Sequence, residues 1–255
     1  MESFASQITG FHVPQGKLGV FFLGQAGFVF KTDQGKLIAV DPYLSDCCNR
    51  YFGFRRMIAK LLQPYDLIFD LLLATHAHYD HFDVDAAPML LDNGITALIA
   101  AKDVKAECDR LGLKGDFTFL KVGDSVERCD VKIKAIFCDH GPDTPDAVGF
   151  RLQFGNITVC MTGDARFRPD LPADPDAQNA DLLILPINGA YGNLNAHEAV
   201  ETAKRLHPAL TVPCHFGNFA EHGGNPMEFQ KEAGDAKLAY RIMRQGEVIL
   251  LGDEK

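Results

Sequence analysis

The chain has 255 residues, of which 47% are hydrophobic and 23% are charged, a composition typical of a globular protein that can bury a sizeable core. Acidic residues outnumber basic ones by 34 to 25, and the net charge of −9 argues against a surface for long nucleic acids, which needs clustered Lys and Arg. No apolar run approaches the roughly 20 residues of a membrane-spanning helix, and the start MESFASQITGF lacks the pattern of a signal peptide.

The cysteines predict a reducing environment. There are seven of them, an odd number, and no CxxC pair occurs. Cys129, Cys138 and Cys160 lie in strand-like runs, where a reduced thiol packs as a small hydrophobic group. We therefore expect a soluble protein of the cytoplasm. No linker or low-complexity segment divides the chain, so we expect one domain over residues 1–255, and a homo-oligomer is left open.

Hydrophobic runs and their periodicity predict strands that alternate with helices, in an α/β arrangement. In chain order, strands are expected at 18–23, 27–31, 37–40, 70–74, 95–100, 117–122, 126–138, 147–154, 157–161, 182–185, 210–212 and 248–251. Helices are expected at 51–62, 84–92, 102–111, 196–206 and 226–236. The helix at 196–206 has the clearest start, because Asn195 and Glu198 form a capping-box pattern.

One local pattern occurs twice. Gly27 and Gly149 each begin a predicted hairpin, and the second strand of each hairpin ends in an aspartate, Asp41 or Asp164. The repetition is either a coincidence between two ordinary hairpins or the trace of two similar halves. In the second case each half is a sheet with helices outside, the two halves meet face to face, and metal-binding residues collect where the loops at the strand ends converge.

The segment 75–81, Thr-His-Ala-His-Tyr-Asp-His, directly follows a predicted buried strand. In an extended backbone, His76 and His78 project to the same side of the chain. Asp80 and His81 come next, where the chain turns towards the following helix. Crowded protonated imidazoles repel one another and buried neutral ones need partners, and a divalent cation meets both requirements. The alternative, a polar surface loop that happens to be rich in histidine, is disfavoured by the apolar strand before it.

Three further candidates stand alone, each after an apolar strand: His140, Asp164 and His215. Gly163 allows the backbone to approach the site closely just before Asp164. A single histidine at a strand end is often structural. The shared placement of the three residues nevertheless favours a common site at the strand ends.

These residues resemble the metallo-β-lactamase superfamily and, within it, the L-ascorbate-6-phosphate lactonase family and related metal-dependent hydrolases. The flanking segments that share the resemblance are 23–28, 41–46, 185–189, 195–199 and 213–216. The similarity extends from about residue 19 to residue 229. It implies a four-layer αβ/βα sandwich of the metallo-β-lactamase type, with two mixed sheets face to face and helices outside.

The resemblance also implies two divalent metal ions. One would be bound by three histidines, His76, His78 and His140. The other would be bound by Asp80, His81 and His215, with Asp164 bridging both ions. Asp41 resembles the acid that supports the histidine loop in this superfamily, although an Asp before Pro42 also opens a turn. Nitrogen and oxygen donors suit Zn²⁺ or Mn²⁺, and also Fe²⁺.

The expected reaction is the hydrolysis of a lactone or ester of a small polar substrate, phosphorylated or not. Two ions lower the pKa of a bridging water so that hydroxide attacks the substrate, and Asp80 or Asp164 accepts a proton as the intermediate collapses. Candidates for contact with the substrate are Arg166, Tyr191, Asn193 and His197. Arg166 is equally well explained as a surface ion-pair residue, and His197 as a residue that packs at the start of a helix.

Two other functions remain open on the same residues. One is a phosphodiesterase that acts on a small phosphodiester with the same ions. The other is a mononuclear iron oxidoreductase, or a metal-binding protein without catalysis. Both predicted ligand sets are complete in the sequence, and this favours hydrolysis.

Overall fold

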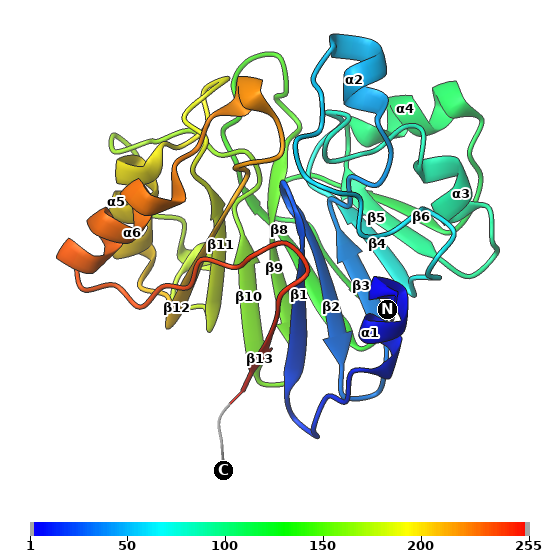
Figure 1. Cartoon of the computed structure of the whole chain (residues 1–255), viewed down its shortest axis with the longest axis horizontal. Helices are drawn as coiled ribbons and strands as arrows, with labels where there is room; N and C mark the ends of the chain where they lie inside the picture. The colour runs from blue at the N-terminus through cyan, green and yellow to red at the C-terminus, as the bar shows by residue number, and fades with distance from the viewer. Residues whose placement is uncertain (1–2, 253–255) are drawn as a thin grey trace.

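The computed structural model describes residues 3–252. Two mixed β-sheets pack face to face, with helices on their outer sides (Figure 1). The first sheet has the strand order β13-β1-β2-β3-β4-β5-β6, and the second has the order β12-β11-β10-β9-β8-β7. The predicted four-layer αβ/βα sandwich is therefore confirmed.

The first sheet changes from antiparallel to parallel pairing after a hairpin. Its strands are β1 (Leu18–Gly24), β2 (Gly27–Thr32), β3 (Leu37–Val40), β4 (Leu71–Ala74), β5 (Ala97–Ala101), β6 (Phe117–Leu120) and β13 (Val248–Leu251). Pairing is antiparallel from β13 to β3 and parallel from β3 to β6. The helices of this half are α1 (Phe4–Gly10), α2 (Cys47–Phe52), α3 (Ala87–Leu91) and α4 (Val104–Leu111).

The second sheet repeats this change of direction. Its strands are β7 (Ser125–Arg128), β8 (Val131–Phe137), β9 (Val148–Phe154), β10 (Ile157–Met161), β11 (Leu182–Pro186) and β12 (Leu210–Cys214). Pairing is antiparallel from β7 to β10 and parallel from β10 to β12. The helices are α5 (Ala196–Leu206) and α6 (Pro226–Asp235), with the short 3₁₀ helices η1 (Pro175–Ala177) and η2 (Ala220–His222). In each sheet the strand pairing thus changes from antiparallel to parallel directly after one hairpin, β2–β3 in the first sheet and β9–β10 in the second.

The main core lies between the two sheets. Successive side chains of a strand point to opposite faces, so β1 buries Val20 and Phe22 against the other sheet and Phe21 under the helices of its own half. Across the interface, the rings of Phe30 and Phe154 lie 5.5 Å apart. Burial on both faces explains why these strands appear in the sequence as nearly continuous apolar runs.

Two predicted elements are wrong. The single strand expected at 126–138 is two strands, β7 and β8, because Cys129 and Asp130 have φ angles of 52° and 60° and form a tight turn between them. The helix expected at 51–62 is the earlier and shorter α2. It ends at Phe52, because the following Gly53 has a left-handed φ of 78° that terminates the helix. In addition, α1 was not anticipated, and α3 is shorter than the helix expected at 84–92.

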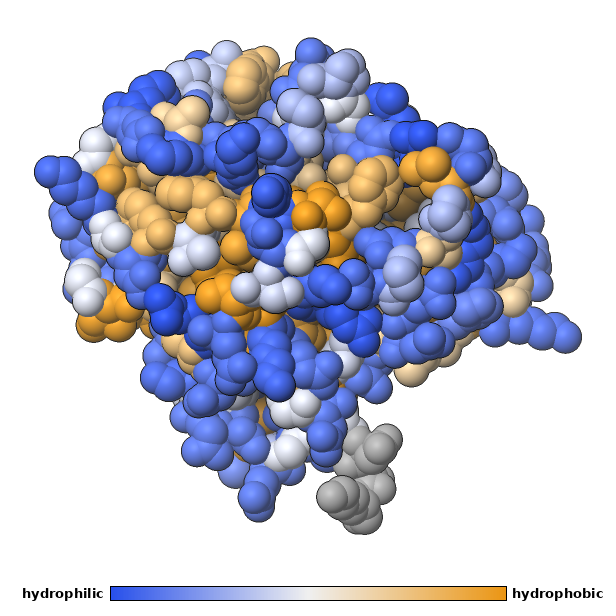
Figure 2. Space-filling view, turned by 180° about the vertical axis from the view of Figure 1, so that it is seen from behind, coloured by the Kyte–Doolittle hydropathy of each residue, from blue (hydrophilic) through white to orange (hydrophobic). Residues whose placement is uncertain are grey.

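The surface is mainly polar. Figure 2, which shows the side opposite to that of Figure 1, has hydrophobic residues near its centre within a largely hydrophilic surface. None of the helices formed by residues 3–252 combines the length and the apolarity needed to cross a membrane. All seven cysteines are free thiols, and six of them are buried. Of the three that were expected to pack as small hydrophobic groups, Cys138 and Cys160 are buried and Cys129 is only partly buried. The cytoplasmic location remains a prediction.

Candidate metal centre

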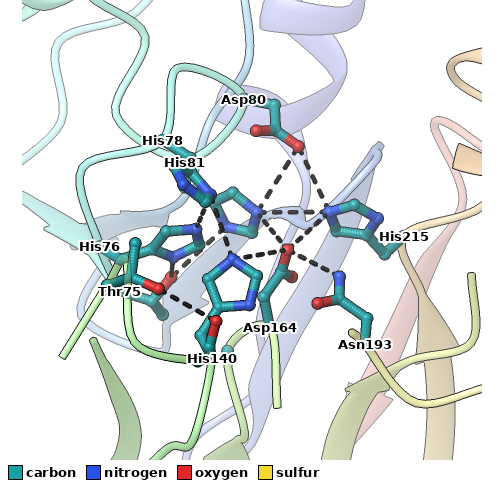
Figure 3. Close-up of polar contacts among 12 residues, drawn as sticks. Thr75, His76, His78, Asp80, His81, His140, Asp164, Asn193 and His215 are labelled. Carbon is teal, nitrogen blue, oxygen red and sulfur yellow. Dashed lines mark hydrogen bonds and ion pairs between the residues drawn. The ribbon is translucent and has the colours of Figure 1, made fainter. Parts of the chain in front are cut away.

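The structure brings all seven predicted metal ligands to one place (Figure 3). Four of them lie on the loop that follows β4: His76, His78, Asp80 and His81. The other three follow strands of the second sheet, β8, β10 and β12: His140, Asp164 and His215. The cluster therefore forms where the loops of the two halves meet, as the two-halves interpretation predicts.

Asp41, at the end of β3, holds the histidine loop from behind. Its Oδ1 accepts a hydrogen bond from the backbone N–H of Thr75 at 2.8 Å, and its Oδ2 accepts one from the Thr75 hydroxyl at 2.7 Å. The same Oδ2 lies 2.8 Å from Nδ1 of His81 and accepts the proton of that nitrogen. The other nitrogen of His81, Nε2, is therefore directed into the cluster, which is the usual effect of a carboxylate behind a histidine ligand.

Asp83 ties the segment after Asp41 to the same loop. Its Oδ2 accepts hydrogen bonds from the backbone N–H groups of Leu44 and Ser45, at 2.8 and 2.6 Å, and its Oδ1 accepts one from the Ser45 hydroxyl at 2.5 Å. The chain after β3 and the chain after β4 are thus fixed to each other.

The first donor set consists of three imidazoles. Nδ1 of His78 lies 3.0 Å from Nε2 of His76 and 3.1 Å from Nε2 of His140. Tetrahedral donors bonded to Zn²⁺ at about 2.0–2.1 Å stand about 3.3–3.4 Å from one another, so this spacing fits a single ion. Burial lowers the pKa of all three histidines, and each ring is therefore neutral, with a lone pair available to a metal.

The second donor set combines a carboxylate with two imidazoles. Nε2 of His215 lies 3.2 Å from Oδ2 of Asp80 and 3.3 Å from Nε2 of His81. Oδ2 of Asp80 and Nε2 of His81 lie 3.6 Å apart. These distances also suit donors that share one ion.

Asp164 stands between the two sets. Its Oδ2 lies 3.1 Å from Nε2 of His215, 3.3 Å from Nε2 of His81 and 3.9 Å from Nε2 of His140. Asn193 donates a hydrogen bond to the same oxygen at 2.8 Å and fixes its position. The residue before Asp164 must be small, because a Cβ on Gly163 would lie 2.9 Å from the carbonyl oxygen of Val148. The close approach expected at Gly163 is therefore present.

The carboxylates divide the histidines into two classes. Burial alone would lower the pKa of His81 and His215, but the charges of Asp164 and Asp80 outweigh it. They raise the pKa of His81 well above its ordinary value and that of His215 to about 9. In return, although burial favours their neutral forms, the imidazolium charges hold the pKa of Asp80 and Asp164 well below the usual range. The second donor set is therefore a buried ion-pair network, whereas the first is uncharged.

Two residues of the site were not identified from the sequence, Gln25 and His222. Nε2 of Gln25 donates to Oδ2 of Asp80 at 2.8 Å and lies 2.9 Å from Nδ1 of His222. The ring of His222 stacks on that of His215, with centroids 5.0 Å apart and planes 3° from parallel. Asp80, His215 and His222 also form a potential metal-binding group. Gln25 follows β1 and so had the strand-end signal, but an amide is not a typical metal ligand; His222 lies in η2, away from any strand end.

Four residues at the site or its cavity have an unusual backbone conformation. Gln25, Asp41, Tyr191 and His215 all have left-handed φ angles, between 47° and 60°, which non-glycine residues seldom adopt. The N–H of His215 donates to the carbonyl oxygen of Gln25 at 2.7 Å, and this bond helps to hold both residues in place. Such conformations persist where the surrounding structure enforces them, most often at functional sites.

A cavity of about 640 Å³ opens beside the cluster. Of the four predicted substrate contacts, Tyr191 and Asn193 line it, whereas Arg166 and His197 do not. Arg166 packs against two neighbouring loops, and its Nη2 lies 2.9 Å from the place that a Cβ on Gly141 would occupy. It lines a separate, smaller cavity. The side chain of His197 is 64% exposed, and its Nδ1 lies 3.2 Å from a carboxylate oxygen of Glu232 on α6. The structure therefore gives no support to Arg166 and His197 as substrate contacts.

Comparison with known proteins agrees with this architecture. A family model described as a beta-lactamase superfamily domain matches residues 19–215. A protein of Polynucleobacter asymbioticus named UPF0173 metal-dependent hydrolase is 25% identical over 254 residues, which cover 92% of this chain and 87% of that protein.

Solved structures share the fold. Igni18, a metallo hydrolase from Ignicoccus hospitalis, superposes with a TM-score of 0.75 and 21% identity, covering 93% of this chain and all (100%) of that one. The metallo-beta-lactamase fold protein YhfI from Bacillus subtilis gives a TM-score of 0.71 and 19% identity, covering 92% and 100% of the two chains. Because the family model spans all seven clustered residues, from His76 to His215, this chain belongs to the metallo-beta-lactamase superfamily.

Proposed function

We propose that this protein is a metal-dependent hydrolase that holds two divalent ions and cleaves a carboxylic ester or a lactone. The main support is the position of Asp164, whose Oδ2 lies between two donor sets at the wall of an open cavity. All donors are nitrogen or oxygen, which suits Zn²⁺, Mn²⁺ or Fe²⁺. The relative named as a metal-dependent hydrolase supports the same class of reaction. Membership of the L-ascorbate-6-phosphate lactonase branch stays a prediction.

In this proposal each side chain has a defined role. The first ion would be held by His76, His78 and His140, and the second by Asp80, His81 and His215. Asp164 would contribute to both, and Asp41 orients His81 through its Nδ1. Two bound ions supply an activated water and polarise the oxygen that gains charge.

The acid–base step falls to the carboxylates that face the cavity. Asp80 and Asp164 both line it, so each lies next to the place where a substrate binds. Each is fixed by one amide donor at 2.8 Å, Asp80 by Gln25 and Asp164 by Asn193. One of the two carboxylates takes a proton from the attacking water and returns it to the departing oxygen, so that the ester and water give a carboxylic acid and an alcohol.

The two alternative functions make different demands on the same site. A mononuclear iron oxidoreductase needs one donor set, whereas here two sets of three side chains lie close together and Asp164 lies near both. A phosphodiesterase would also use both ions, so it differs from an esterase here only in the substrate that it cleaves. Metal content and substrate preference therefore distinguish the three functions.

The test is to strip the purified protein of metal and reload it with Zn²⁺, Mn²⁺ or Fe²⁺. Bound metal is then counted by mass spectrometry, and lactones, carboxylic esters and small phosphodiesters are assayed side by side. We expect two equivalents of metal and turnover of a lactone or ester. A single equivalent of iron without hydrolysis, or turnover of phosphodiesters alone, would contradict the proposal. The control is the variant Asp109→Asn, which changes an exposed aspartate on α4, and its folding and metal content should equal those of the unchanged protein.

A further inference from the structure

One wall of the cavity is aromatic. It is formed by four side chains, Phe52, Phe54, Tyr79 and Tyr191. The ring of Phe52 lies 5.5 Å from that of Tyr79 and 6.1 Å from that of Phe54, and Phe54 lies 6.1 Å from Tyr191. These are contact distances for aromatic rings. The four rings therefore form a continuous surface that faces the metal-binding cluster.

This wall leaves apolar surface open to the cavity. Phe52 is 56% exposed and Tyr191 is 60% exposed, although both touch other rings of the wall. Isolated exposed aromatic residues are common, but several that adjoin one another beside a cavity mark a binding surface. Local structure explains their position: α2 ends at Phe52, and the left-handed Gly53 redirects the chain so that Phe52 and Phe54 both line the cavity.

The cavity also lacks a cation to recognise a negatively charged group. Among residues 3–252, no Lys or Arg lines it, whereas the exposed carboxylate of Asp143 does. Proteins usually bind phosphate and carboxylate groups with Arg or Lys. Bound metal ions attract negative charge at the reacting centre, but a phosphate further along the substrate would meet aromatic rings and Asp143.

From these observations we infer that the natural substrate carries an aromatic or other apolar group next to the ester or lactone that is cleaved, and no phosphate or carboxylate there. The inference rests on the proposed hydrolase function and specifies its substrate class. It departs from the expectation of a small polar substrate, phosphorylated or not. The apolar group would lie on Phe52, Phe54 and Tyr191, with the scissile bond at the metal ions.

The test compares two γ-butyrolactones that carry either a phenyl group or a carboxylate at the γ-carbon. With the protein loaded with two metal ions, we expect kcat/KM to be at least about tenfold higher for the phenyl lactone, since even one methylene in a hydrophobic pocket is worth about 10–200-fold. Equal or faster hydrolysis of the carboxylate lactone would overturn the inference and leave the hydrolase function intact. If the two-metal protein cleaves no lactone or ester at all, the proposed function itself fails, and the inference falls with it.

Variants of Phe52 locate the effect on the wall. Because Phe52 is largely exposed, its replacement leaves the core intact. Phe52→Ala should lower kcat/KM for the phenyl lactone by about fivefold, mainly through KM, and leave the carboxylate lactone nearly unchanged. Phe52→Arg should improve the carboxylate lactone relative to the phenyl lactone. The control is Tyr65→Ala, an aromatic residue that is 73% exposed and lies outside the cavity, which should change neither. Equal effects of Phe52→Ala on both lactones would contradict the inference.

Discussion

In the first half of the molecule the β2–β3 hairpin leads to Asp41, and in the second half the β9–β10 hairpin leads to Asp164. Each hairpin has a glycine at or next to its first residue that packs on backbone. A Cβ on Gly27 would lie 3.2 Å from the carbonyl oxygen of Asp41, and a Cβ on Gly149 would lie 2.6 Å from the carbonyl oxygen of Met161. Both aspartates also reach the same ring. Asp41 lies 2.8 Å from Nδ1 of His81, and Asp164 lies 3.3 Å from its Nε2.

The two aspartates nevertheless differ in their surroundings. The carboxylate of Asp41 bonds to Thr75 and His81 of the histidine loop and does not line the cavity. Asp164 lines the cavity and lies close to both donor sets. Similar hairpins in the two halves thus provide a supporting residue in one case and a candidate metal ligand in the other. The predictions below separate these two roles.

Asp164→Asn should have the largest effect, because it removes the one carboxylate that both donor sets share. We expect kcat/KM to fall by more than about 10³-fold, as is usual for a residue on which the transition state depends directly. Bound metal should fall below two equivalents in the same preparation. If the variant keeps two equivalents and full activity, Asp164 does not join two ions.

Asp41→Asn should have an intermediate effect. Its carboxylate contacts no proposed ion and instead orients His81, and the loss of such a partner typically costs about 10–100-fold in metal affinity or activity. Metal titration and steady-state kinetics measure this directly. A loss as large as that of Asp164→Asn would show that the two aspartates have equivalent roles.

The two donor sets should respond differently to pH. The pKa of His215 is raised to about 9, and the pKa of His81 is raised as well. At neutral pH both rings are therefore protonated on both nitrogens, and an incoming ion must displace one proton from each ring. Affinity for the second ion should therefore weaken as the pH falls from about 9 towards 7, by about tenfold per pH unit for each proton displaced. His76, His78 and His140 have lowered pKa values and release no such protons.

Calorimetry in buffers of different ionisation enthalpy counts the protons released by each ion. We expect release with the second ion and almost none with the first at pH 7. The same pH dependence for both ions would show that the carboxylates do not divide the histidines into two classes.

Cys47→Ala should have the smallest effect on catalysis. Cys47 is buried at the start of α2, where its thiol donates to the carbonyl oxygen of Tyr79 at 3.3 Å. Its loss should lower the free energy of unfolding by about 1 kcal/mol, and kcat/KM should stay within about twofold. Thermal unfolding of the metal-loaded protein and steady-state assays measure the two quantities; a large loss of activity without a loss of stability would place this thiol in the reaction.

The two halves also differed in how far the sequence predicted the site. In the first half His76, His78, Asp80 and His81 form a dense local motif, so their chemistry was visible without the fold. In the second half each residue stands alone after its strand, and the prediction depended on the shared placement of three strand ends. His222 offered no such signal, because the packing of η2, rather than a strand, brings its ring onto that of His215.

Fold prediction failed where a single backbone conformation decided the outcome. The strands β7 and β8 were merged because Cys129 gives no sign of a left-handed turn, and the turn tendency of Asp130 was overlooked inside a long alternating run. Arg166 was expected at the substrate because it is two residues from Asp164, but the chain turns after Asp164 and directs the guanidinium at Gly141 instead. A residue directly after a strand end could therefore be placed at the site from the sequence. The position of a residue further along the following loop could not.

The most direct test of the two-ion site is anomalous X-ray diffraction from crystals of the metal-loaded protein. Two peaks about 3.5–4 Å apart are expected on either side of the Asp164 carboxylate. One should lie among His76, His78 and His140, and the other among Asp80, His81 and His215. A single peak, or one between Asp80 and His222 with none at the three imidazoles, would contradict the account.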